Sequence, residues 1–289
     1  MSVSATIAHA TAALAEAGVV SARTDAELLA AHVLATTRGR LLLAPDLTEE
    51  QHREYASLIA ARESRVPLQH LTGRAAFRHL DLAVGPGVFV PRPETELLVE
   101  WGLAWLRGHT ADPVVVDLCA GSGAIALSVA TEHPGADVYA VERDPAALAW
   151  LRRNAAEAPV TVLAGDVIDP ATLADLDGRV DLVLCNPPYV PLTAAGQLSV
   201  EVTEHDPAVA VFGGPDGLDL IRPLVGRVAA LLAPGGAFGV EHDDTHGGAV
   251  PALLRADGRF ERVRLHHDLA GRPRFTTARR AGGWQDGAP

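Results

Sequence analysis

Residues 114–127 have the sequence VVVDLCAGSGAIAL, which predicts a buried strand, a tight glycine turn and the start of a helix. The β-branched run is typical of a strand inside a parallel sheet. Gly121 and Gly123 allow the backbone to turn sharply and to approach a ligand closely. Because an ordinary strand-to-helix turn has the same pattern, this segment by itself predicts an α/β fold and leaves the ligand open.

Two more strands follow at spacings typical of nucleotide-binding α/β domains. Residues 138–141 predict a strand that ends at Glu142, about twenty residues after the glycines, where a carboxylate accepts hydrogen bonds from a ribose diol. Residues 160–163 predict a third strand, and Asp166 after it can accept a hydrogen bond from an adenine amino group. A nicotinamide-dependent dehydrogenase would use the same half-domain, so these residues leave both hydride transfer and methyl transfer open.

A tetrapeptide, Asn186-Pro187-Pro188-Tyr189, directly follows the apolar run at residues 180–185. Proline has a fixed φ and no N–H, so we expect the proline carbonyls to stay outside a sheet ladder and available as acceptors. With the side-chain carbonyl of Asn186 they form a fork for both hydrogens of a planar –NH2 group, while Tyr189 covers one face of it. Such a grip aims the nitrogen lone pair at an electrophile. A proline-rich turn is the alternative interpretation of these four residues.

At the end of a fourth strand, this tetrapeptide resembles the signature of S-adenosylmethionine-dependent amino methyltransferases, which act on adenine N6, glutamine N5 and some other planar nitrogens. Four further motifs occur in the order typical of the release factor glutamine methyltransferases, the PrmC/HemK family: PLQHLTG at 67–73, FVPRPETELLVE at 89–100, LLAPGGAFGVEH at 231–242 and DLAGRPRFTTA at 268–278. The resemblance covers nearly the full length of the chain. It implies methylation of the glutamine amide in the Gly-Gly-Gln loop of class I peptide-chain release factors.

The resemblance also implies a fold and a set of site residues. The fold is α/β, with a Rossmann-like seven-stranded class I S-adenosylmethionine-dependent methyltransferase domain, mainly parallel with one antiparallel strand, and a small all-helical N-terminal domain. The implied cofactor is S-adenosylmethionine, and the product is S-adenosylhomocysteine. The implied cofactor-binding residues are Asp117, Cys119, Ala120, Gly121, Ser122, Gly123, Glu142, Asp166, Val167 and Asn186. The implied catalytic residues are Asn186, Pro187 and Tyr189, and substrate binding adds Pro188 and Arg92.

Two places depart from the family pattern. Cys119-Ala120 stand where Gly-Thr is common, and Val167 stands where a larger aromatic residue often follows the acid. Ala120 costs little if its φ is negative, whereas Val167 removes an aromatic surface that could sandwich the adenine. We therefore expect cofactor affinity to be the family property that applies least directly to this chain.

The chain is expected to divide into a helical N-terminal domain at 1–75, a hairpin and linker at 76–93, the methyltransferase domain at 94–280 and a disordered tail at 281–289. Capping boxes are predicted at Thr24-Asp25-Ala26-Glu27 and Thr48-Glu49-Glu50-Gln51. We interpret the helical domain as a docking domain for the release factor. A structural cap on the methyltransferase domain is the alternative, because an apolar stripe looks the same in both cases.

Composition excludes several other classes. The 289 residues carry a net charge of −12, which argues against direct nucleic-acid binding because that needs positive charge to displace counterions. The two cysteines, Cys119 and Cys185, exclude a disulfide framework. No apolar run approaches membrane length and no basic segment precedes an apolar stretch at the start, so we expect no membrane span and a cytoplasmic protein. We further expect a monomer.

Glu241, His242 and His246 have the helical spacing of a metal pair, but the glycines at 247 and 248 break the helix and no third ligand follows, so we expect no metal. Two rival functions remain. An adenine-N6 methyltransferase on DNA or RNA would share the tetrapeptide but should carry a basic target-recognition region, which the sequence lacks. A non-catalytic protein that binds S-adenosylmethionine and docks to the translation machinery would not need the intact tetrapeptide.

Overall fold

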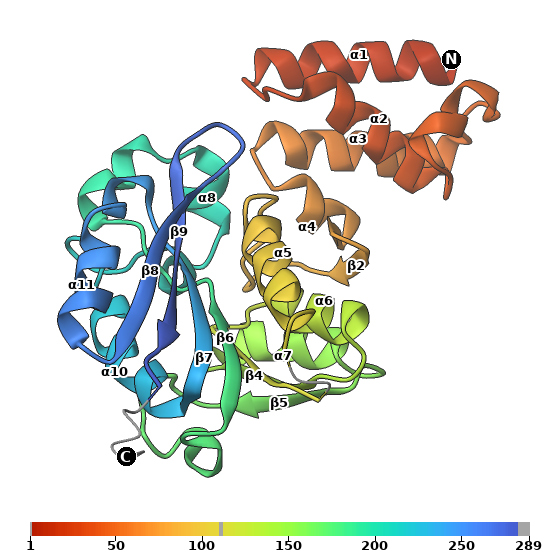
Figure 1. Ribbon diagram of the computed structural model, residues 1–289. Coiled ribbons are helices and arrows are strands. Elements are labelled where there is room, and N and C mark those ends of the chain that lie inside the picture. The colour runs from red at the N-terminus through yellow and green to blue at the C-terminus, as the bar shows by residue number, and fades with distance from the viewer. Residues whose placement is uncertain (1, 110–111, 283–289) are drawn as a thin grey trace, which may run out of the picture. The chain divides into compact units, whose positions relative to one another are not determined.

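The computed structural model describes residues 2–109 and 112–282 (Figure 1). They form two compact units. The helical unit comprises the described residues up to Arg74 together with Val84–Pro86 and Ser199–His205. The sheet unit comprises Ala75–Ala83, Gly87–Leu198 and the described residues from Asp206 onward. The tail expected at 281–289 lies, from residue 283 on, outside the described residues.

The helical unit is built on one apolar core. Leu14, Ala26 and Leu29, from two different helices, are fully buried in it. Apolar burial of this kind is the main stabilising term for such short helices. The elements of the unit are α1 (Val3–Glu16), α2 (Ala22–Val33), η1 (Arg38–Leu43), α3 (Glu49–Glu63), α4 (Leu68–Thr72) and α8 (Val200–His205).

One of the two predicted capping boxes forms. At the start of α3, the Thr48 hydroxyl accepts from the Gln51 N–H at 3.2 Å, and the Gln51 side chain accepts from the Thr48 N–H at 3.0 Å. The box predicted at Thr24 was wrong, because α2 begins at Ala22 and Thr24 lies inside its first turn. There the carboxylate of Asp25 accepts instead from the Ser21 hydroxyl at 2.8 Å.

A short segment from far along the chain joins the helical unit through ion pairs. Glu201 of α8 accepts from Arg62 at 3.0 Å and from Arg65 at 2.8 Å. Arg62 is almost fully buried and also donates to Asp25 at 2.8 Å. Because a buried guanidinium is costly without partners, these contacts explain why a helix that follows the tetrapeptide in sequence belongs to this unit.

The sheet unit contains a seven-stranded sheet in the order β5-β4-β3-β6-β7-β9-β8. Neighbouring strands from β5 to β7 pair in parallel, and β9 runs antiparallel to both of its neighbours. The prediction of a mainly parallel sheet with one antiparallel strand is confirmed. The strands are β3 (Val114–Leu118), β4 (Asp137–Glu142), β5 (Val160–Ala164), β6 (Val180–Cys185), β7 (Leu232–Glu241), β8 (Phe260–His267) and β9 (Pro273–Arg280), and a separate hairpin consists of β1 (Arg74–Phe77) and β2 (Leu80–Ala83).

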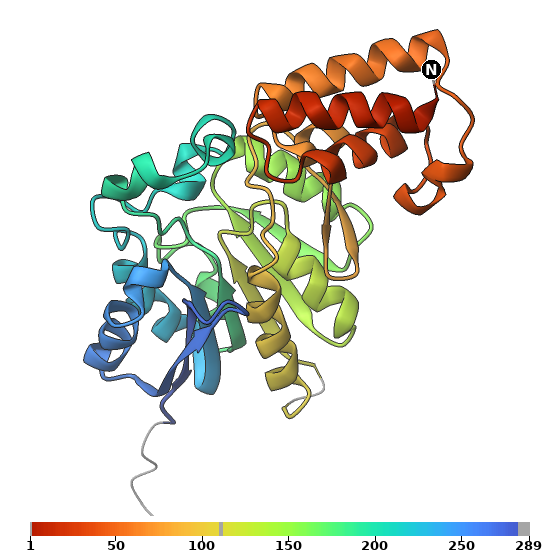
Figure 2. The same ribbon diagram turned by 90° about the horizontal axis from the view of Figure 1, so that it is seen from above.

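Helices cover both faces of this sheet (Figures 1 and 2). Val183 and Cys185 of β6 pack in the cluster formed with α10 and α11, whereas the alternate residues Leu182 and Leu184 face Gly102 of α5. All four are fully buried, so the strand is apolar throughout. The helices are α5 (Thr95–Leu106), α6 (Ala124–Glu132), α7 (Pro145–Asn154), α9 (Ala208–Val211), α10 (Ile221–Leu231) and α11 (Ala249–Asp257), with short 3-10 turns η2 (Ala174–Leu176), η3 (Leu192–Gln197) and η4 (Asp244–His246).

The strand order determines where a ligand can bind. Leu118 at the end of β3 is in register with Cys185 at the end of β6, which is in turn in register with Val240 of β7. The chain leaves β3 toward β4 on one side, while β6 lies on the other. In open parallel sheets, the crevice at such a change of direction, beyond the carboxyl ends of the strands, is the usual ligand site.

Candidate active site

The glycine turn after β3 contains three residues with positive φ, as is typical of a tight ligand-binding turn. Gly121 and Gly123 adopt positive φ values of 55° and 88°. Cys119 does so too, at 65°, although a Cβ disfavours this left-handed region by about 1–2 kcal/mol. Ala120 is not among the described residues with positive φ. The conformational cost of the Cys-Ala variation therefore falls on Cys119, where glycine is common, and Ala120 fits without strain.

Asp117 brings a buried acceptor to this turn. Its Oδ2 accepts from the Ala126 N–H at 3.0 Å in the first turn of α6, and its Oδ1 has no partner among the described residues. Burial raises the pKa of Asp117 to about 8, and the charge of Glu142 adds to the shift. An unpaired buried oxygen costs free energy, so this atom fits a hydrogen-bond donor of a bound ligand.

Glu142 is locked onto the same turn. Its Oε2 accepts from the Gly121 N–H at 2.9 Å, and its Oε1 accepts from the N–H groups of Arg143 and Asp144, both at 2.8 Å. Three of the roughly four acceptor positions of a carboxylate are therefore occupied by backbone. One position on Oε2 is left, which suits one ribose hydroxyl rather than the two that the sequence suggested.

Asp166 and Val167 follow β5. Asp166 accepts from the Ile168 N–H at 3.1 Å and from Arg143 at 3.4 Å. Val167 is 5% exposed and packs in the main core of the sheet unit. The exposed apolar side chain beside Asp166 is that of Ile168, which sequence reasoning did not single out. An apolar contact to an adenine ring at this point is therefore better placed on Ile168 than on Val167.

The tetrapeptide after β6 is held by a glycine-rich backbone segment. A Cβ at Gly213 would lie 2.7 Å from the carbonyl oxygen of Pro188, and one at Gly217 would lie 2.3 Å from that of Tyr189. Both carbonyls therefore lie against backbone that only glycine allows. In the described chain no backbone N–H donates to the carbonyl of Pro187 or of Pro188, so the packing of Pro188 against Gly213 is what distinguishes the two carbonyls. The predicted acceptor fork thus narrows to the Asn186 side chain and the Pro187 carbonyl.

Behind the tetrapeptide lies a buried carboxylate that sequence reasoning considered only as a metal ligand. Glu241, at the end of β7, is 1% exposed. Its Oε1 accepts from the Tyr189 hydroxyl at 2.8 Å and its Oε2 from the Thr95 hydroxyl at 2.7 Å. The Asn186 amide nitrogen donates to Thr95 at 3.2 Å. The signal that could have revealed Glu241 is its position directly after the run Ala-Phe-Gly-Val at 237–240, which has the apolar character of a buried strand.

Burial raises the pKa of Glu241, while hydrogen bonds from Thr95 and Tyr189 and the positive charge of Arg274 oppose the rise. Burial also raises the pKa of Tyr189. Arg274 is itself anchored, because it donates to Asp268 at 3.0 Å. Burial outweighs the two hydrogen-bond donors and the nearby cation, so the pKa of Glu241 lies above its usual value.

Arg92, predicted to face the cofactor or the glutamine, has partners within the sheet unit. Its guanidinium donates to the nearly buried carboxylate of Asp206 and lies over the Phe89 ring at 4.7 Å. About a third of its side chain is exposed. A role in substrate binding stays a prediction, and any such contact would come from a guanidinium already fixed in place.

The histidines considered as metal ligands are engaged otherwise. His242 contacts the Thr276 hydroxyl at 2.8 Å, and His246 contacts the Asp216 carbonyl at 2.9 Å. The residues that the structure describes contain no group of three or more side chains arranged to hold a metal ion. No helix among them is both long and apolar enough to cross a membrane.

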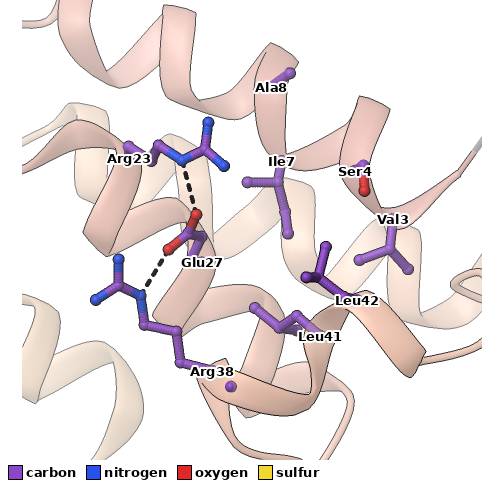
Figure 3. A pocket seen from close by; sticks show the side chains of 10 residues that line it. Val3, Ser4, Ile7, Ala8, Arg23, Glu27, Arg38, Leu41 and Leu42 are labelled. Carbon is purple, nitrogen blue, oxygen red and sulfur yellow. Dashed lines mark hydrogen bonds and ion pairs between the residues drawn. The ribbon is translucent and has the colours of Figure 1, made fainter.

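The helical unit has a pocket of its own, of about 440 Å³, between α1, α2 and η1 (Figure 3). Glu27 lies at one side of it and accepts from Arg23 at 2.8 Å and from Arg38 at 2.6 Å. Leu42, on its rim, and the adjacent Leu43 are 89% and 88% exposed. The pocket contains none of the site residues predicted from the sequence.

Known proteins resemble the chain over nearly its whole length. Two family models match it, the PrmC N-terminal domain over residues 5–73 and the methyltransferase small domain over residues 95–205. The chain is 54% identical to the release factor glutamine methyltransferase of Mycolicibacterium smegmatis, over 95% of this chain and 96% of that protein. It is 50% identical to the protein of the same name from Streptomyces coelicolor, over 96% of this chain and 98% of that protein.

Among solved structures, a methyltransferase from Pyrococcus furiosus covers 81% of this chain and all of its own length, with a TM-score of 0.50. At 16% sequence identity this likeness concerns the fold alone. The relatives at about half identity cover 95% and 96% of this chain, and therefore both the helical unit and the sheet unit. The chain therefore belongs to the family of release factor glutamine methyltransferases.

Proposed function

We propose that the chain transfers a methyl group from S-adenosylmethionine to the side-chain amide nitrogen, N5, of the glutamine in the Gly-Gly-Gln motif of class I peptide-chain release factors, and so modulates translation termination. Its relatives carry the name release factor glutamine methyltransferase. The observation that carries the proposal is the pair of acceptors at Asn186 and Pro187, held at the carboxyl edge of the sheet beside the glycine turn.

The cofactor would occupy the glycine turn. S-Adenosylmethionine, when bound, supplies a methyl group on a positively charged sulfur. The unpaired Oδ1 of Asp117 would accept from its ammonium group once the carboxyl group has lost its proton, and the remaining acceptor position of Glu142 fits a ribose hydroxyl. Asp166 would accept from the adenine amino group, and the exposed side chain of Ile168 would cover a face of its ring. The hydrogen-bond acceptors around the turn thus match the donor groups of this cofactor.

The tetrapeptide would grip the glutamine. The Asn186 and Pro187 oxygens accept the two hydrogens of the –NH2 group, which orients the nitrogen lone pair toward the methyl group. Tyr189, with its hydroxyl fixed on Glu241, covers one face of the amide. No residue needs to act as a base beforehand, because the nitrogen carries a surplus proton only after its new bond has formed, and this proton passes to water when the methylated glutamine leaves the site. Catalysis would rest on positioning and on exclusion of water.

The helical unit would dock the release factor. The exposed Leu42 lines the pocket in Figure 3, where two arginines flank a single glutamate, and the equally exposed Leu43 follows it in sequence. An exposed apolar pair next to a partly basic rim suits a partner surface with an apolar side chain and acidic neighbours. The expected cytoplasmic location and monomeric state stay predictions.

One experiment separates this proposal from an adenine-N6 methyltransferase. The purified chain is incubated with S-adenosylmethionine carrying a labelled methyl group and with either a class I release factor or duplex DNA. We expect label on the release factor, lost when the Gly-Gly-Gln glutamine is replaced by alanine, and none on the DNA. Label on adenine would support the rival, and label on neither would favour a non-catalytic binding protein. The net charge of −12 favours the first outcome.

A further inference from the structure

The buried polar groups behind the tetrapeptide have a fixed direction of hydrogen bonding. Both carboxyl oxygens of Glu241 accept, Oε1 from the Tyr189 hydroxyl and Oε2 from the Thr95 hydroxyl. Thr95 has a single hydroxyl hydrogen, and its oxygen lies 2.7 Å from Oε2 of Glu241, so that hydrogen is given to the carboxylate. The Thr95 oxygen can then only accept from its other neighbour, the Asn186 side chain at 3.2 Å. Asn186 must therefore turn its –NH2 end toward Thr95 and its oxygen away from it.

This direction matters because the two ends of a carboxamide have nearly the same shape. If the Asn186 amide rotated by half a turn, two N–H donors would face a substrate group that itself carries only N–H donors in the plane. Such a contact is repulsive, and the acceptor fork would be lost. Shape and packing alone do not prevent this rotation. A partner that can only accept is needed to prevent it.

We propose that Glu241 is a positioning residue that acts through Thr95 to keep the Asn186 oxygen facing the glutamine nitrogen. This inference rests on the proposed function, because the orientation matters only for a substrate with an –NH2 group. The same carboxylate also orients Tyr189 through the 2.8 Å hydrogen bond to its hydroxyl. Glu241 thereby determines which end of the Asn186 amide faces the substrate, and it fixes the position of Tyr189. It does both without contacting the substrate.

Glu241→Gln is the decisive change, tested in two backgrounds. A glutamine –NH2 group can donate to the Thr95 oxygen, which frees the Thr95 hydrogen to donate to Asn186 and favours the flipped amide. We expect the single-turnover rate on a release factor to fall at least tenfold, while cofactor affinity measured by calorimetry stays within twofold.

In the Asn186→Asp background, both ends of the side chain are oxygens, so no flip is possible and the freed Thr95 hydrogen has a good acceptor. There we expect Glu241→Gln to leave the remaining rate unchanged or to raise it. An equal fold-loss in both backgrounds would mean that Glu241 supports the fold only, and it would overturn the proposal. Thr95→Ser, which keeps the hydroxyl, should retain most of the activity, whereas Thr95→Val should behave like Glu241→Gln.

A measurement without turnover separates this inference from the proposed function. In the cofactor-free protein, nuclear Overhauser contacts should join the Asn186 side-chain amide hydrogens to the Thr95 methyl group, and they should weaken in Glu241→Gln. If the contacts are present but wild-type protein does not methylate a release factor, the function is wrong and the orientation stands. If the contacts are missing from the folded wild-type protein, the orientation is wrong whatever the substrate.

Discussion

The hydroxyl of Tyr189 donates a 2.8 Å hydrogen bond to Glu241, which links the segment after β6 to the end of the neighbouring strand β7. The second oxygen of this carboxylate accepts from Thr95 at the start of α5. Three segments that are distant in sequence thus meet at one buried carboxyl group. The geometry of the acceptor fork therefore depends on residues outside the tetrapeptide as much as on the tetrapeptide itself.

Removal of the Tyr189 hydroxyl should destabilise the fold. Tyr189→Phe takes one donor from a buried carboxylate, and we expect the free energy of unfolding to fall by about 1–3 kcal/mol. Urea unfolding followed by circular dichroism measures the change. Tyr139→Phe is the matched control, because its hydroxyl donates to Asp137 in an exposed position and should cost less than about 0.5 kcal/mol. Equal losses in the two variants would mean that Glu241 is paired adequately without Tyr189.

The buried Asp117 should make stability depend on pH. Its pKa is about 8 in the folded protein, above the usual 3.8, so the folded chain retains a proton that the unfolded chain has lost. The associated stability is complete below about pH 4 and is lost as the pH rises toward 8. Asp117→Asn stays neutral, so its free energy of unfolding should fall less between pH 5 and pH 8 than that of the wild type. Urea titrations of both proteins at several pH values measure this. If the free energy of unfolding changed equally with pH in both proteins, Asp117 would already be charged at pH 5.

Glu142 should contribute to cofactor binding. Glu142→Ala removes the acceptor for a ribose hydroxyl and frees three backbone N–H groups of the turn, so we expect S-adenosylmethionine affinity to fall by about 1.5–3 kcal/mol. Titration calorimetry measures it. The exposed Glu157, changed to alanine, is the control for a lost negative charge and should bind as the wild type does. Unchanged affinity in Glu142→Ala would place the cofactor elsewhere.

The exposed leucines of the helical unit should matter for the release factor alone. We expect the double variant Leu42→Ser and Leu43→Ser to raise the KM for the folded release factor about tenfold or more, because each buried leucine at an interface contributes about 1.5–3 kcal/mol. Its rate on a short Gly-Gly-Gln peptide should not change. Val20→Ser, at another fully exposed apolar position of the unit, is the control. If KM for the release factor is unaffected, docking uses a different surface.

The sequence predicts local features of this protein better than its long-range contacts. Neighbouring residues encode the strands around the glycine turn, the capping box at Thr48 and the tetrapeptide. Their sequence patterns can therefore be recognised directly. Thr95 and Glu241 lie 146 positions apart, and no local sequence pattern predicts the hydrogen bond between their side chains. The same holds for Glu201, whose segment joins the helical unit through Arg62 of α3 and through Arg65 just after that helix.

Two further differences arise from conformation rather than from distance. The sequence offered both proline carbonyls as acceptors, but the backbone at Gly213 lies against that of Pro188. Cys119 occupies a left-handed position that its residue type does not favour. Functional turns often hold such conformations because the surrounding structure fixes them. The conformational preferences of single residues therefore predict the backbone least well at the candidate site.

The rate of methyl transfer by Asn186→Ala tests the acceptor fork most directly. The measurement is a single-turnover assay with excess enzyme, saturating S-adenosylmethionine and a class I release factor. We expect the rate to fall about a hundredfold or more, equivalent to about 2.7 kcal/mol of transition-state stabilisation, with cofactor affinity little changed. Asn186→Asp, which keeps an acceptor and the shape, should show a partial defect. A wild-type rate in Asn186→Ala would mean that the tetrapeptide is only a turn, and it would contradict the proposed catalytic site.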